Sequence, residues 1–220
     1  FKSLANIFAQ YNFELYLVGG TSRDFLLNLE IKDMDVATSA NPDEITQIIN
    51  NENLDTTFER FGSFIYKYDD IKFEITCLRK ESKYSDSRHP LELTFVRDIK
   101  IDYLRRDFTV NAIYIDKDLK IYDFCDGQLD LKDRTLRMIG NPNLRIKEDP
   151  LRIIRALRFM LVLDFNLDAI LEEAIKSNIE LLKLINPEKI KSELLKMKEV
   201  DINKQREIFK RFNIVYLLDL

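Results

Sequence analysis

The feature that most constrains this chain is a short apolar run that stops at two adjacent glycines. Residues 15–18 predict a strand, Gly19 and Gly20 a tight turn, and the residues from Arg23 onward a helix. Free backbone N–H groups and the positive dipole end of such a helix hold phosphate oxygens, and glycine lets the backbone approach a ligand closely. A Gly-Gly pair before a helix is, by itself, more typical of a plain turn.

Two aspartates that follow this turn change the interpretation. If residues 34–38 form a strand, the side chains of Asp33 and Asp35 project from the same face. Carboxylates this close repel each other unless a cation lies between them, and oxygen ligands suit Mg²⁺ that carries a nucleoside triphosphate. A lone Asp-x-Asp is more typical of a solvated acidic turn. Joined to the glycine turn, the pair predicts two-metal phosphoryl or nucleotidyl transfer.

The combined pattern resembles a known family. Gly19-Gly20-x-x-Arg23-Asp24 followed by Asp33-x-Asp35 is similar to motif A of the class II tRNA nucleotidyltransferases and the related bacterial poly(A) polymerases. The resemblance continues in family order to about residue 197. It implies an α/β nucleotidyltransferase head, a small mixed β-sheet with helices, over residues 1–140, followed by an all-helical neck over residues 141–220. The sequence Ile139-Gly140-Asn141-Pro142 marks the predicted boundary.

Composition narrows the class of protein. The 220 residues are 45% hydrophobic and 33% charged, which is typical of a soluble globular protein, and neither a membrane-spanning run nor a signal peptide is evident. Two cysteines without metal or disulfide spacing favour a reducing cytoplasm, and a single histidine excludes a His-rich metal centre within these residues. The start at Phe1, without an initiator Met, suggests a piece of a longer protein.

Net charge gives a mixed indication about nucleic acid. A formal charge of −4 argues against a nucleic-acid partner, but the arginines are clustered in the sequence and so predict local basic patches. The clusters are Arg105 with Arg106, and then Arg134, Arg137, Arg145, Arg152, Arg155 and Arg158.

Three strand-like runs predict a β-meander after a helix that begins near Pro42. They cover residues 54–60, 63–68 and 71–78, with turns at Gly62 and Asp69-Asp70. Glu74 lies on the last run and supplies a third carboxylate if that strand pairs with the Asp33–Asp35 strand. An ordinary exposed glutamate fits the spacing equally well; the family resemblance implies that Glu74 completes the metal site.

Residues 79–98 are polar, mixed in charge and without periodicity, which predicts a long loop that is either functional or disordered. In the resembling family, a flexible loop at this position is linked to the switch from CTP to ATP addition. Its full length here disfavours an enzyme that adds only C. His89 stands where the family usually has a second arginine, so a role resting on that arginine is in doubt.

The nonapeptide from Leu104 to Ala112 carries a second motif. Its arginines, aspartate and asparagine supply donors for phosphates and polar groups for ribose hydroxyls, although Arg-Arg-Asp alone is more typical of a surface ion-pair cluster. The segment resembles motif B of the family, which is associated with the choice of ribose. The resemblance implies that Gly19, Gly20, Arg23 and Arg106 bind phosphates, with Asp107 and Asn111 near the ribose.

The helical part carries a polar stripe. Asp149, Arg152, Arg155 and Arg158 are three residues apart and predict a slanted line on one helix whose first turn contains Pro150. Such a stripe is more often a solvated face. The resemblance implies instead that Asp149 and Arg152 pair with the Watson–Crick edge of CTP or ATP, while Arg155 and Arg158 hold the triphosphate. Pro150 is a weak hint of a poly(A) polymerase, because CCA-adding members often have alanine there.

Further helices are predicted over residues 167–178, 186–197 and 201–211, and residues 186–194 resemble motif E, which braces the template helix. The implied activity is template-independent addition of C and A from CTP and ATP to the tRNA 3′ end, with Mg²⁺ held by Asp33 and Asp35 and assisted by Glu74. An A-adding specialist, a poly(A) polymerase and a non-catalytic nucleotide- or RNA-binding module remain as alternatives. The sequence predicts no membrane partner and leaves the oligomeric state open, and the family's tRNA-gripping body and tail would lie beyond Leu220.

Overall fold

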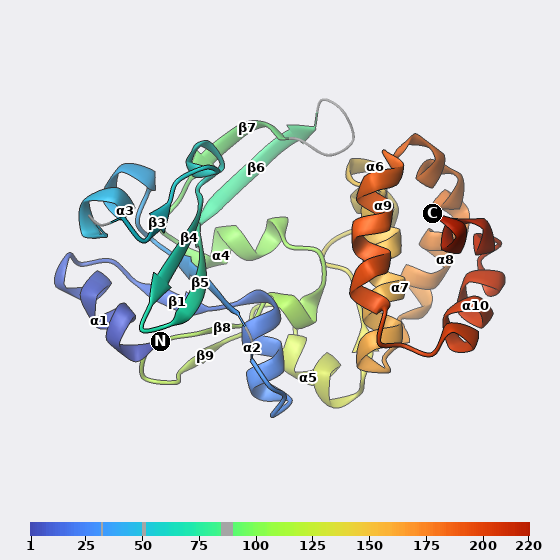
Figure 1. The fold of residues 1–220 in the computed structure, drawn as a ribbon, viewed down its shortest axis with the longest axis horizontal. Helices are drawn as coiled ribbons and strands as arrows, with labels where there is room; N and C mark the ends of the chain where they lie inside the picture. The colour runs from blue at the N-terminus through green and yellow to red at the C-terminus, as the bar shows by residue number, and fades with distance from the viewer. Residues whose placement is uncertain (32, 50–51, 85–89) are drawn as a thin grey trace. The chain divides into compact units, whose positions relative to one another are not determined.

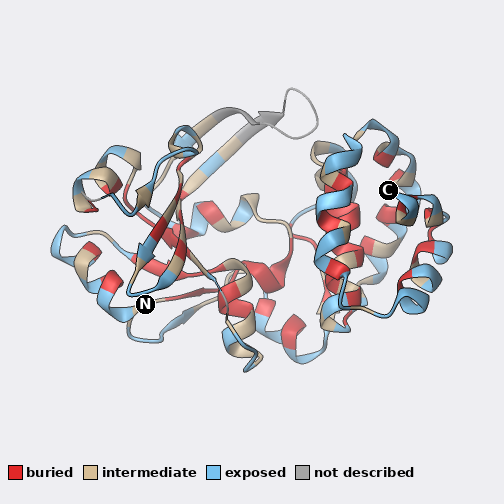
Figure 2. Cartoon of the chain, in the orientation of Figure 1, coloured by how far each residue is buried: buried red, intermediate tan, exposed pale blue. Residues whose placement is uncertain are grey.

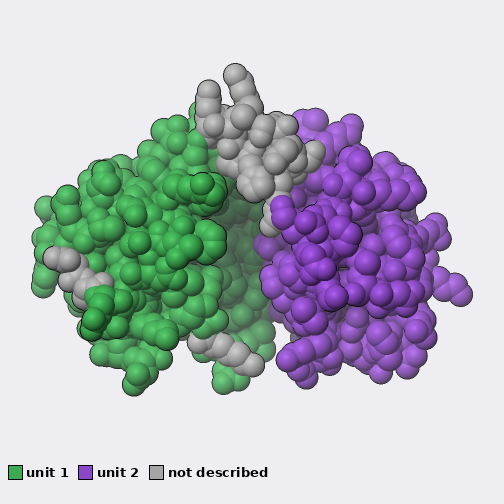
Figure 3. Space-filling view, turned by 45° about the horizontal axis from the view of Figure 1, so that its top comes forward, with its two compact units in different colours: residues 1–83, 90–131 green, residues 84–89, 132–220 purple. Residues whose placement is uncertain are grey.

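A computed structural model describes residues 1–31, 33–49, 52–84 and 90–220. Contacts divide the chain into two compact units, the first containing residues 1–83 and 90–131 and the second residues 132–220 (Figure 3). The sequence predicts different domain limits, 1–140 and 141–220, and these limits remain a prediction. No helix in the described ranges has both the length and the apolar character that a membrane crossing requires.

The first unit is built on a mixed sheet whose described strands run in the order β3-β4-β5-β2-β1-β8-β9 (Figure 1). β2 and β5 are parallel, whereas the other neighbouring strands are antiparallel. These strands are β1 (Leu15–Leu17), β2 (Met34–Thr38), β3 (Leu54–Asp55), β4 (Ser63–Tyr68), β5 (Ile71–Cys77), β8 (Tyr114–Ile115) and β9 (Ile121–Tyr122). The helices of this unit are α1 (Lys2–Gln10), α2 (Gly19–Leu26), α3 (Pro42–Ile48), α4 (Ile99–Asp102) and α5 (Gly127–Lys132), with 3-10 turns at Glu59–Phe61, Tyr103–Arg105 and Thr109–Asn111.

Local signals explain most of these elements. Asn41 and Glu44 form a capping box at the start of α3, with Pro42 in the first turn. Asp69 and Asp70 take positive φ angles of 49° and 60° between β4 and β5, as a tight hairpin turn requires. The core strands are apolar and buried, as Figure 2 shows, and Phe73 and Ile75 on β5 are fully enclosed. The head is therefore the α/β fold that the sequence predicts.

The strand predicted over residues 54–60 is wrong beyond Asp55. The Asp55 side chain accepts hydrogen bonds from the N–H and hydroxyl of Thr57, so the chain turns locally instead of extending. The 3-10 turn Glu59–Phe61 follows, and Gly62 closes it with a φ of 68°. Two strands of the predicted meander, β4 and β5, form as expected.

The long loop predicted over residues 79–98 is wrong in its flanks. β6 (Arg79–Tyr84) and β7 (Pro90–Phe95) pair as a two-stranded ribbon, and α4 begins soon after it. Backbone pairing in a ribbon needs no apolar alternation, so the polar sequence carries no strand signal. His89, where the sequence departs from the family, lies outside the described residues.

The second unit is helical apart from one short pair of parallel strands, β10 (Thr135–Leu136) and β11 (Asn166–Leu167). α7 lies at its centre, and eight of its residues are buried. The helices are α6 (Pro142–Glu148), α7 (Leu151–Leu163), α8 (Ala169–Asn178), α9 (Pro187–Leu194) and α10 (Ile202–Arg211), with 3-10 turns at Ile179–Leu184, Leu195–Met197 and Val215–Asp219.

Candidate functional site

The turn at the start of α2 wraps the carboxylate of Asp35. The Gly20 N–H donates to Asp35 Oδ2 over 3.1 Å, and Gly19 has a φ of 65°. A Cβ atom added at Gly19 or Gly20 would stand 3.1 or 3.2 Å from the same oxygen. Both glycines are thus needed for close approach, and the group approached within the protein is an aspartate.

The backbone around the two aspartates is fixed by Thr21. Its hydroxyl oxygen accepts the Asp35 N–H over 2.7 Å and donates to the Asp33 carbonyl over 3.2 Å. Thr21 is buried, whereas the Asp33 side chain is half exposed. The structure therefore holds Asp33 and Asp35 next to the start of α2, as the sequence predicts, through a threonine that the sequence reasoning missed.

The sheet register places Glu74 beside Asp35. β2 and β5 run parallel with Asp35 opposite Glu74, so both side chains leave the same face of the sheet. The Lys72 ammonium lies 2.6 Å from Glu74 Oε1 and 3.6 Å from Asp33 Oδ2. The pairing of β2 with β5 thus brings Glu74 beside Asp35 as a third carboxylate. Lys72, which the sequence reasoning did not consider, lies between Glu74 and Asp33.

The electrostatics of Asp35 are those of a carboxylate without enough positive charge nearby. Burial raises its pKa, and the neighbouring charge of Glu74 raises it further. The Gly20 hydrogen bond and the charges of Arg106 and Arg23 oppose this rise without cancelling it. Positive charge brought beside Asp35 would stabilise its ionised form.

A divalent cation fits this arrangement of carboxylates. Asp33 and Asp35 supply hard oxygen ligands two residues apart, and the arginine charges near Asp35 do not cancel the rise of its pKa. Among the described residues, no group of three His, Cys, Asp or Glu side chains already forms a metal-binding set. A cation held by one or two carboxylates completes its coordination with water and substrate phosphates, which is the usual arrangement for Mg²⁺.

Arg23 and Asn111 meet beside this turn. Arg23 Nη1 donates to Asn111 Oδ1 over 2.9 Å, and Asn111 Nδ2 donates to Asp107 Oδ1 over 3.3 Å. The guanidinium of Arg23 also pairs with Asp24 at 2.7 Å. Three residues predicted to bind phosphate or ribose thus form one hydrogen-bonded chain, which fixes their orientation.

Arg106 is placed differently from a surface phosphate ligand. Its guanidinium is held by Asp102, with 2.9 Å between Nη2 and Oδ2, and Nε donates to the Tyr114 hydroxyl over 2.8 Å. Asp102 is fully buried and was missed by the sequence reasoning. Its position three and four residues before Arg105 and Arg106 is the signal that could have identified it, because this is helical pairing distance.

The predicted continuous stripe in the second unit is wrong at its first member. Asp149 has extended backbone angles of φ −146° and ψ 95° and lies between α6 and α7, not on the helix that carries the arginines. Pro150 explains the break, because a proline disfavours helical geometry in the residue before it. Asp149 Oδ1 instead accepts the Leu151 N–H over 3.1 Å and caps the first turn of α7.

The arginines of α7 do not form a solvated face. Arg152 is buried, and its Nη1 donates to the Arg145 carbonyl over 2.7 Å and to Glu148 over 3.2 Å. Arg158 pairs with the buried Glu193 of α9 at 3.0 Å, and Arg155 reaches the same carboxylate at 4.0 Å. Glu193 lies in the segment predicted to brace this helix, and these contacts fit that role.

Comparison with known proteins agrees with this geometry. The family profile described as the poly A polymerase head domain matches residues 15–137. The chain belongs to this family. The match confirms the family resemblance and the α/β head that the motifs imply.

Individual relatives carry the similarity into the helical unit. The chain is 44% identical over 200 residues to a CCA-adding enzyme of Enterococcus faecalis, covering 90% of this chain and 49% of that protein. It is 40% identical over 196 residues to a CCA-adding enzyme of Staphylococcus haemolyticus, covering 89% of this chain and 48% of the relative. The chain therefore spans about half the length of the curated relatives it matches.

Solved structures show the same fold. The Bacillus stearothermophilus CCA-adding enzyme in complex with CTP superposes with a TM-score of 0.87 at 29% identity, over 97% of this chain and 51% of that one. A tRNA nucleotidyltransferase complexed with a primer tRNA and an incoming ATP analog gives a TM-score of 0.79 at 28% identity, over 96% of this chain and 61% of the other.

Proposed function

We propose that the natural protein containing this chain adds C and A from CTP and ATP to the 3′ end of tRNA and releases pyrophosphate. The observation that carries the proposal is the Asp35 carboxylate, enclosed by Gly19 and Gly20, opposite Glu74 and two residues after Asp33. The relatives named as CCA-adding enzymes, and the related structures with CTP, an ATP analog and tRNA, support the substrate class.

In this mechanism Asp33 and Asp35 hold Mg²⁺, and Glu74 supports them from the neighbouring strand. Bound Mg²⁺ would lower the pKa of the attacking 3′-hydroxyl and stabilise the leaving pyrophosphate. Arg23 and Arg106 attract the triphosphate. Their positive charges lie close enough to Asp35 to act on its carboxylate, so they also act on phosphates bound beside it. Gly19 and Gly20 present backbone to it without a side chain in the way.

The remaining predicted residues orient the nucleotide. Asp107 and Asn111 contact the ribose, held by their hydrogen bonds to each other and to Arg23. In the second unit, Asp149 and Arg152 read the base edge, while Arg155 and Arg158 hold the triphosphate. The ion pairs with Glu148 and Glu193 pre-orient these arginines and reduce the entropy lost on binding. Because the proposed substrate is tRNA, we expect the protein to act in the cytoplasm.

Incorporation of labelled CTP and ATP into RNA tests the proposal. The natural full-length protein is incubated with Mg²⁺ and tRNA ending at the discriminator base, at C or at CC, and with an unstructured RNA. Addition of CCA that then stops supports the proposal, whereas addition of A only after CC identifies an A-adding specialist. Open-ended A tails on any RNA identify a poly(A) polymerase of the same family.

The controls separate catalysis from binding. Asp33→Ala and Asp35→Ala should each abolish incorporation, while Asp43→Ala, an exposed acid in the first turn of α3, should leave it unchanged. Absence of incorporation by the wild-type protein, together with CTP binding that does not depend on Mg²⁺, would favour a non-catalytic nucleotide-binding module.

A further inference from the structure

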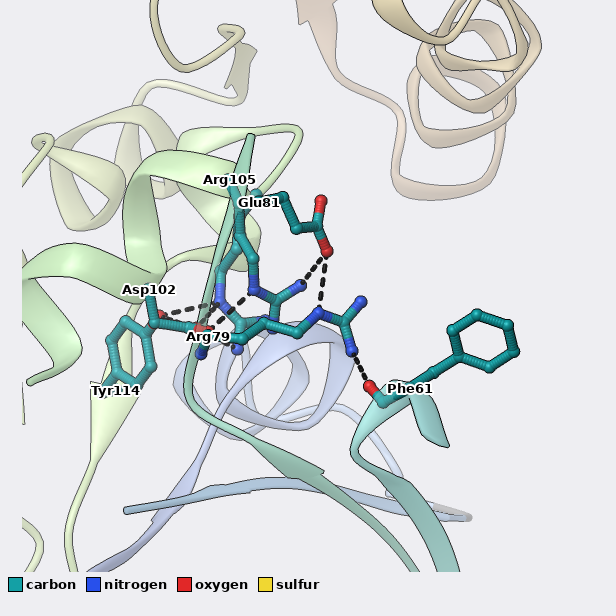
Figure 4. Close-up of polar contacts among 7 residues, drawn as sticks. Phe61, Arg79, Glu81, Asp102, Arg105 and Tyr114 are labelled. Atoms are coloured by element: carbon teal, nitrogen blue, oxygen red, sulfur yellow. Dashed lines mark hydrogen bonds and ion pairs between the residues drawn. The ribbon is translucent and has the colours of Figure 1, made fainter. Parts of the chain in front are cut away.

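A buried charge cluster lies at the root of the β6–β7 ribbon in the first unit (Figure 4). Its centre is the carboxylate of Asp102, the last residue of α4, whose side chain has no exposed surface. A buried carboxylate is costly unless it is both paired and hydrogen-bonded. Here both oxygens are used, and they point to two different parts of the fold.

The first oxygen, Oδ1, holds the start of the ribbon. It accepts the backbone N–H of Arg79 over 2.9 Å and Arg105 Nε over 2.8 Å. Arg79 Nε in turn lies 2.8 Å from Glu81 Oε1 and its Nη1 donates to the Phe61 carbonyl over 2.7 Å, as Figure 4 shows. The hydrogen bond from Arg79 to Oδ1 therefore links the start of β6 to the end of α4.

The second oxygen, Oδ2, holds Arg106. It accepts the Tyr114 hydroxyl over 2.6 Å and Arg106 Nε over 3.1 Å, and Arg106 Nη2 lies 2.9 Å away. The Tyr114 hydroxyl also accepts Arg106 Nε over 2.8 Å, and the guanidinium carbon lies 5.1 Å from the centre of the Tyr114 ring. Arg106 is therefore fixed by a carboxylate and an aromatic side chain together.

The sheet connects this pair to the candidate site. Leu17 on β1 pairs with Ile115 on β8 and with Val36 on β2, so the next residue, Val18, lies between Tyr114 and Asp35. The Val18 N–H donates to the Asp35 carbonyl, and Asp35 pairs with Glu74 on β5. Neighbouring strands are about 4.8 Å apart, so Tyr114 and Asp35 are separated by roughly 10 Å on one face of the sheet.

The described part of the cluster contains charges of both signs. It contains three guanidinium groups, those of Arg79, Arg105 and Arg106, and two carboxylates, those of Glu81 and Asp102. Arg106 contacts the hydroxyl of Tyr114, whose side chain lies on the same face of the sheet as that of Asp35. The guanidinium of Arg106 thus lies over the sheet face that carries the acids of the candidate site.

We propose that Asp102 is a positioning residue, which holds Arg106 so that its guanidinium attracts the nucleotide triphosphate toward the Asp35 face of the sheet. This inference rests on the proposed function for the identity of the nucleotide. The relevant contacts are those of Oδ2 with Arg106 and Tyr114; the Oδ1 contacts serve the ribbon. Asp102 itself does not touch the nucleotide, because it is fully buried behind Arg106 and Tyr114.

Nucleotide affinity and steady-state kinetics of the natural full-length protein test the inference. Asp102→Asn keeps the size of the side chain but replaces one acceptor with a donor that opposes the arginines. We expect the KM and the Kd for CTP and ATP to rise together by about 10–100-fold, with a smaller change in kcat, as for other residues that orient a ligand-binding group. Tyr114→Phe should raise both by about 2–10-fold, since it removes the hydrogen bond donated to Asp102 and the one accepted from Arg106.

Two matched variants distinguish positioning from a structural role. Glu81→Gln weakens the ion pairs of Glu81 with Arg79 and Arg105 and leaves the contacts of Asp102 Oδ2 in place, so the Kd for CTP should stay within about twofold of wild type. Phe8→Leu disturbs the buried face of α1 and should lower the melting temperature without changing the KM. An unchanged KM and Kd in Asp102→Asn, at a lowered melting temperature, would overturn the inference.

A double variant tests the route through Arg106. If Asp102 acts by holding Arg106, then Asp102→Asn should add little to the loss of affinity already caused by Arg106→Lys. Full additivity of the two losses would overturn the inference. If Asp102→Asn does not fold, Tyr114→Phe decides, because an unchanged Kd in that variant is likewise a contradiction.

The two proposals can fail separately. A wild-type protein that binds CTP but incorporates none would contradict the proposed function, while weaker CTP binding in Asp102→Asn would still support the inference. Normal CCA addition by Asp102→Asn with wild-type KM values would contradict the inference alone.

Discussion

Asp35 is partly buried and Asp102 fully buried in the same unit, yet their surroundings have opposite electrostatic effects. Burial raises the pKa of Asp35, and Glu74 raises it further. Burial would also raise the pKa of Asp102, but the charges of Arg106 and Arg105 and the hydrogen bonds from Tyr114 and Arg79 hold it well below its usual range. Burial therefore does not determine the charge state by itself; the compensating groups do.

The difference separates a completed cluster from an incomplete one. Both oxygens of the Asp102 carboxylate accept hydrogen bonds, and two arginines neutralise its charge, so its ionised form stabilises the fold. Asp35 accepts one backbone hydrogen bond and faces another acid, so its negative charge destabilises the fold. Perturbed carboxylates of the second kind concentrate at functional sites, which supports our proposals that Asp35 binds the cation and that Asp102 holds Arg106 in position.

The largest expected effect is on catalysis at Asp35. Asp35→Asn should reduce the rate of nucleotide incorporation by about a thousandfold or more, because cation-based stabilisation of the transition state is worth several kcal/mol. Single-turnover incorporation of labelled CTP measures it, with Asp43→Asn as a matched control. A loss of less than tenfold would show that Asp35 is not central to the chemistry.

The second effect is on stability at Asp102. Asp102→Asn should lower the free energy of unfolding by about 3–5 kcal/mol, because removing one partner leaves buried arginines uncompensated. The low pKa of Asp102 in the folded state means that its contribution is present above the unfolded value of about 3.9 and is lost as pH falls through the folded value. Urea unfolding at pH 7 and pH 3 measures both, and an equal difference between the proteins at both pH values would contradict this account.

The third effect has the opposite sign and concerns Asp35 without added metal. Because its folded pKa is raised, its contribution to stability is present below the unfolded pKa of about 3.9 and is lost as pH rises through the folded value. Asp35→Asn should thus stabilise the metal-free protein by about 1 kcal/mol at pH 7, the usual scale of such a trade-off between stability and function. Thermal unfolding in EDTA tests this, and a destabilised variant would mean that Asp35 is a structural carboxylate.

The smallest effect is expected at Tyr114. Tyr114→Phe removes one hydrogen bond to Asp102 and one to Arg106, and it should cost about 1 kcal/mol of unfolding free energy, since the ring and the remaining ion pairs stay in place. Chemical unfolding measures the change. A cost as large as that of Asp102→Asn would show that the cluster depends on the tyrosine rather than on its charges.

Local sequence signals account for what could be predicted. The strand, the glycine turn and the helix start are consecutive in the chain, so the place of Gly19, Gly20 and Asp35 follows from local pattern alone. Glu74 required one further step, the pairing of β2 with β5, which the spacing left open and the family resemblance favoured. The family resemblance supplied the chemical roles, which the geometry by itself leaves as proposals.

The missed features depend on contacts or on steric rules that apolar periodicity does not show. The pairing of Asp102 with Arg79 and Tyr114 joins segments far apart in the chain. The polar ribbon of β6 and β7 has no apolar period to detect. Asp149 was misplaced because its spacing from the arginines suggested one helix, whereas Pro150 forced an extended residue before α7.

The most direct test of the central claim is a Mg²⁺ titration of the melting temperature, in the presence of CTP, for the wild-type full-length protein, Asp35→Asn and Asp102→Asn. The account predicts that wild type and Asp102→Asn both gain stability with Mg²⁺ while Asp35→Asn does not, because Asp35 is a proposed cation ligand and Asp102 is not. An equal gain in Asp35→Asn and wild type would contradict it.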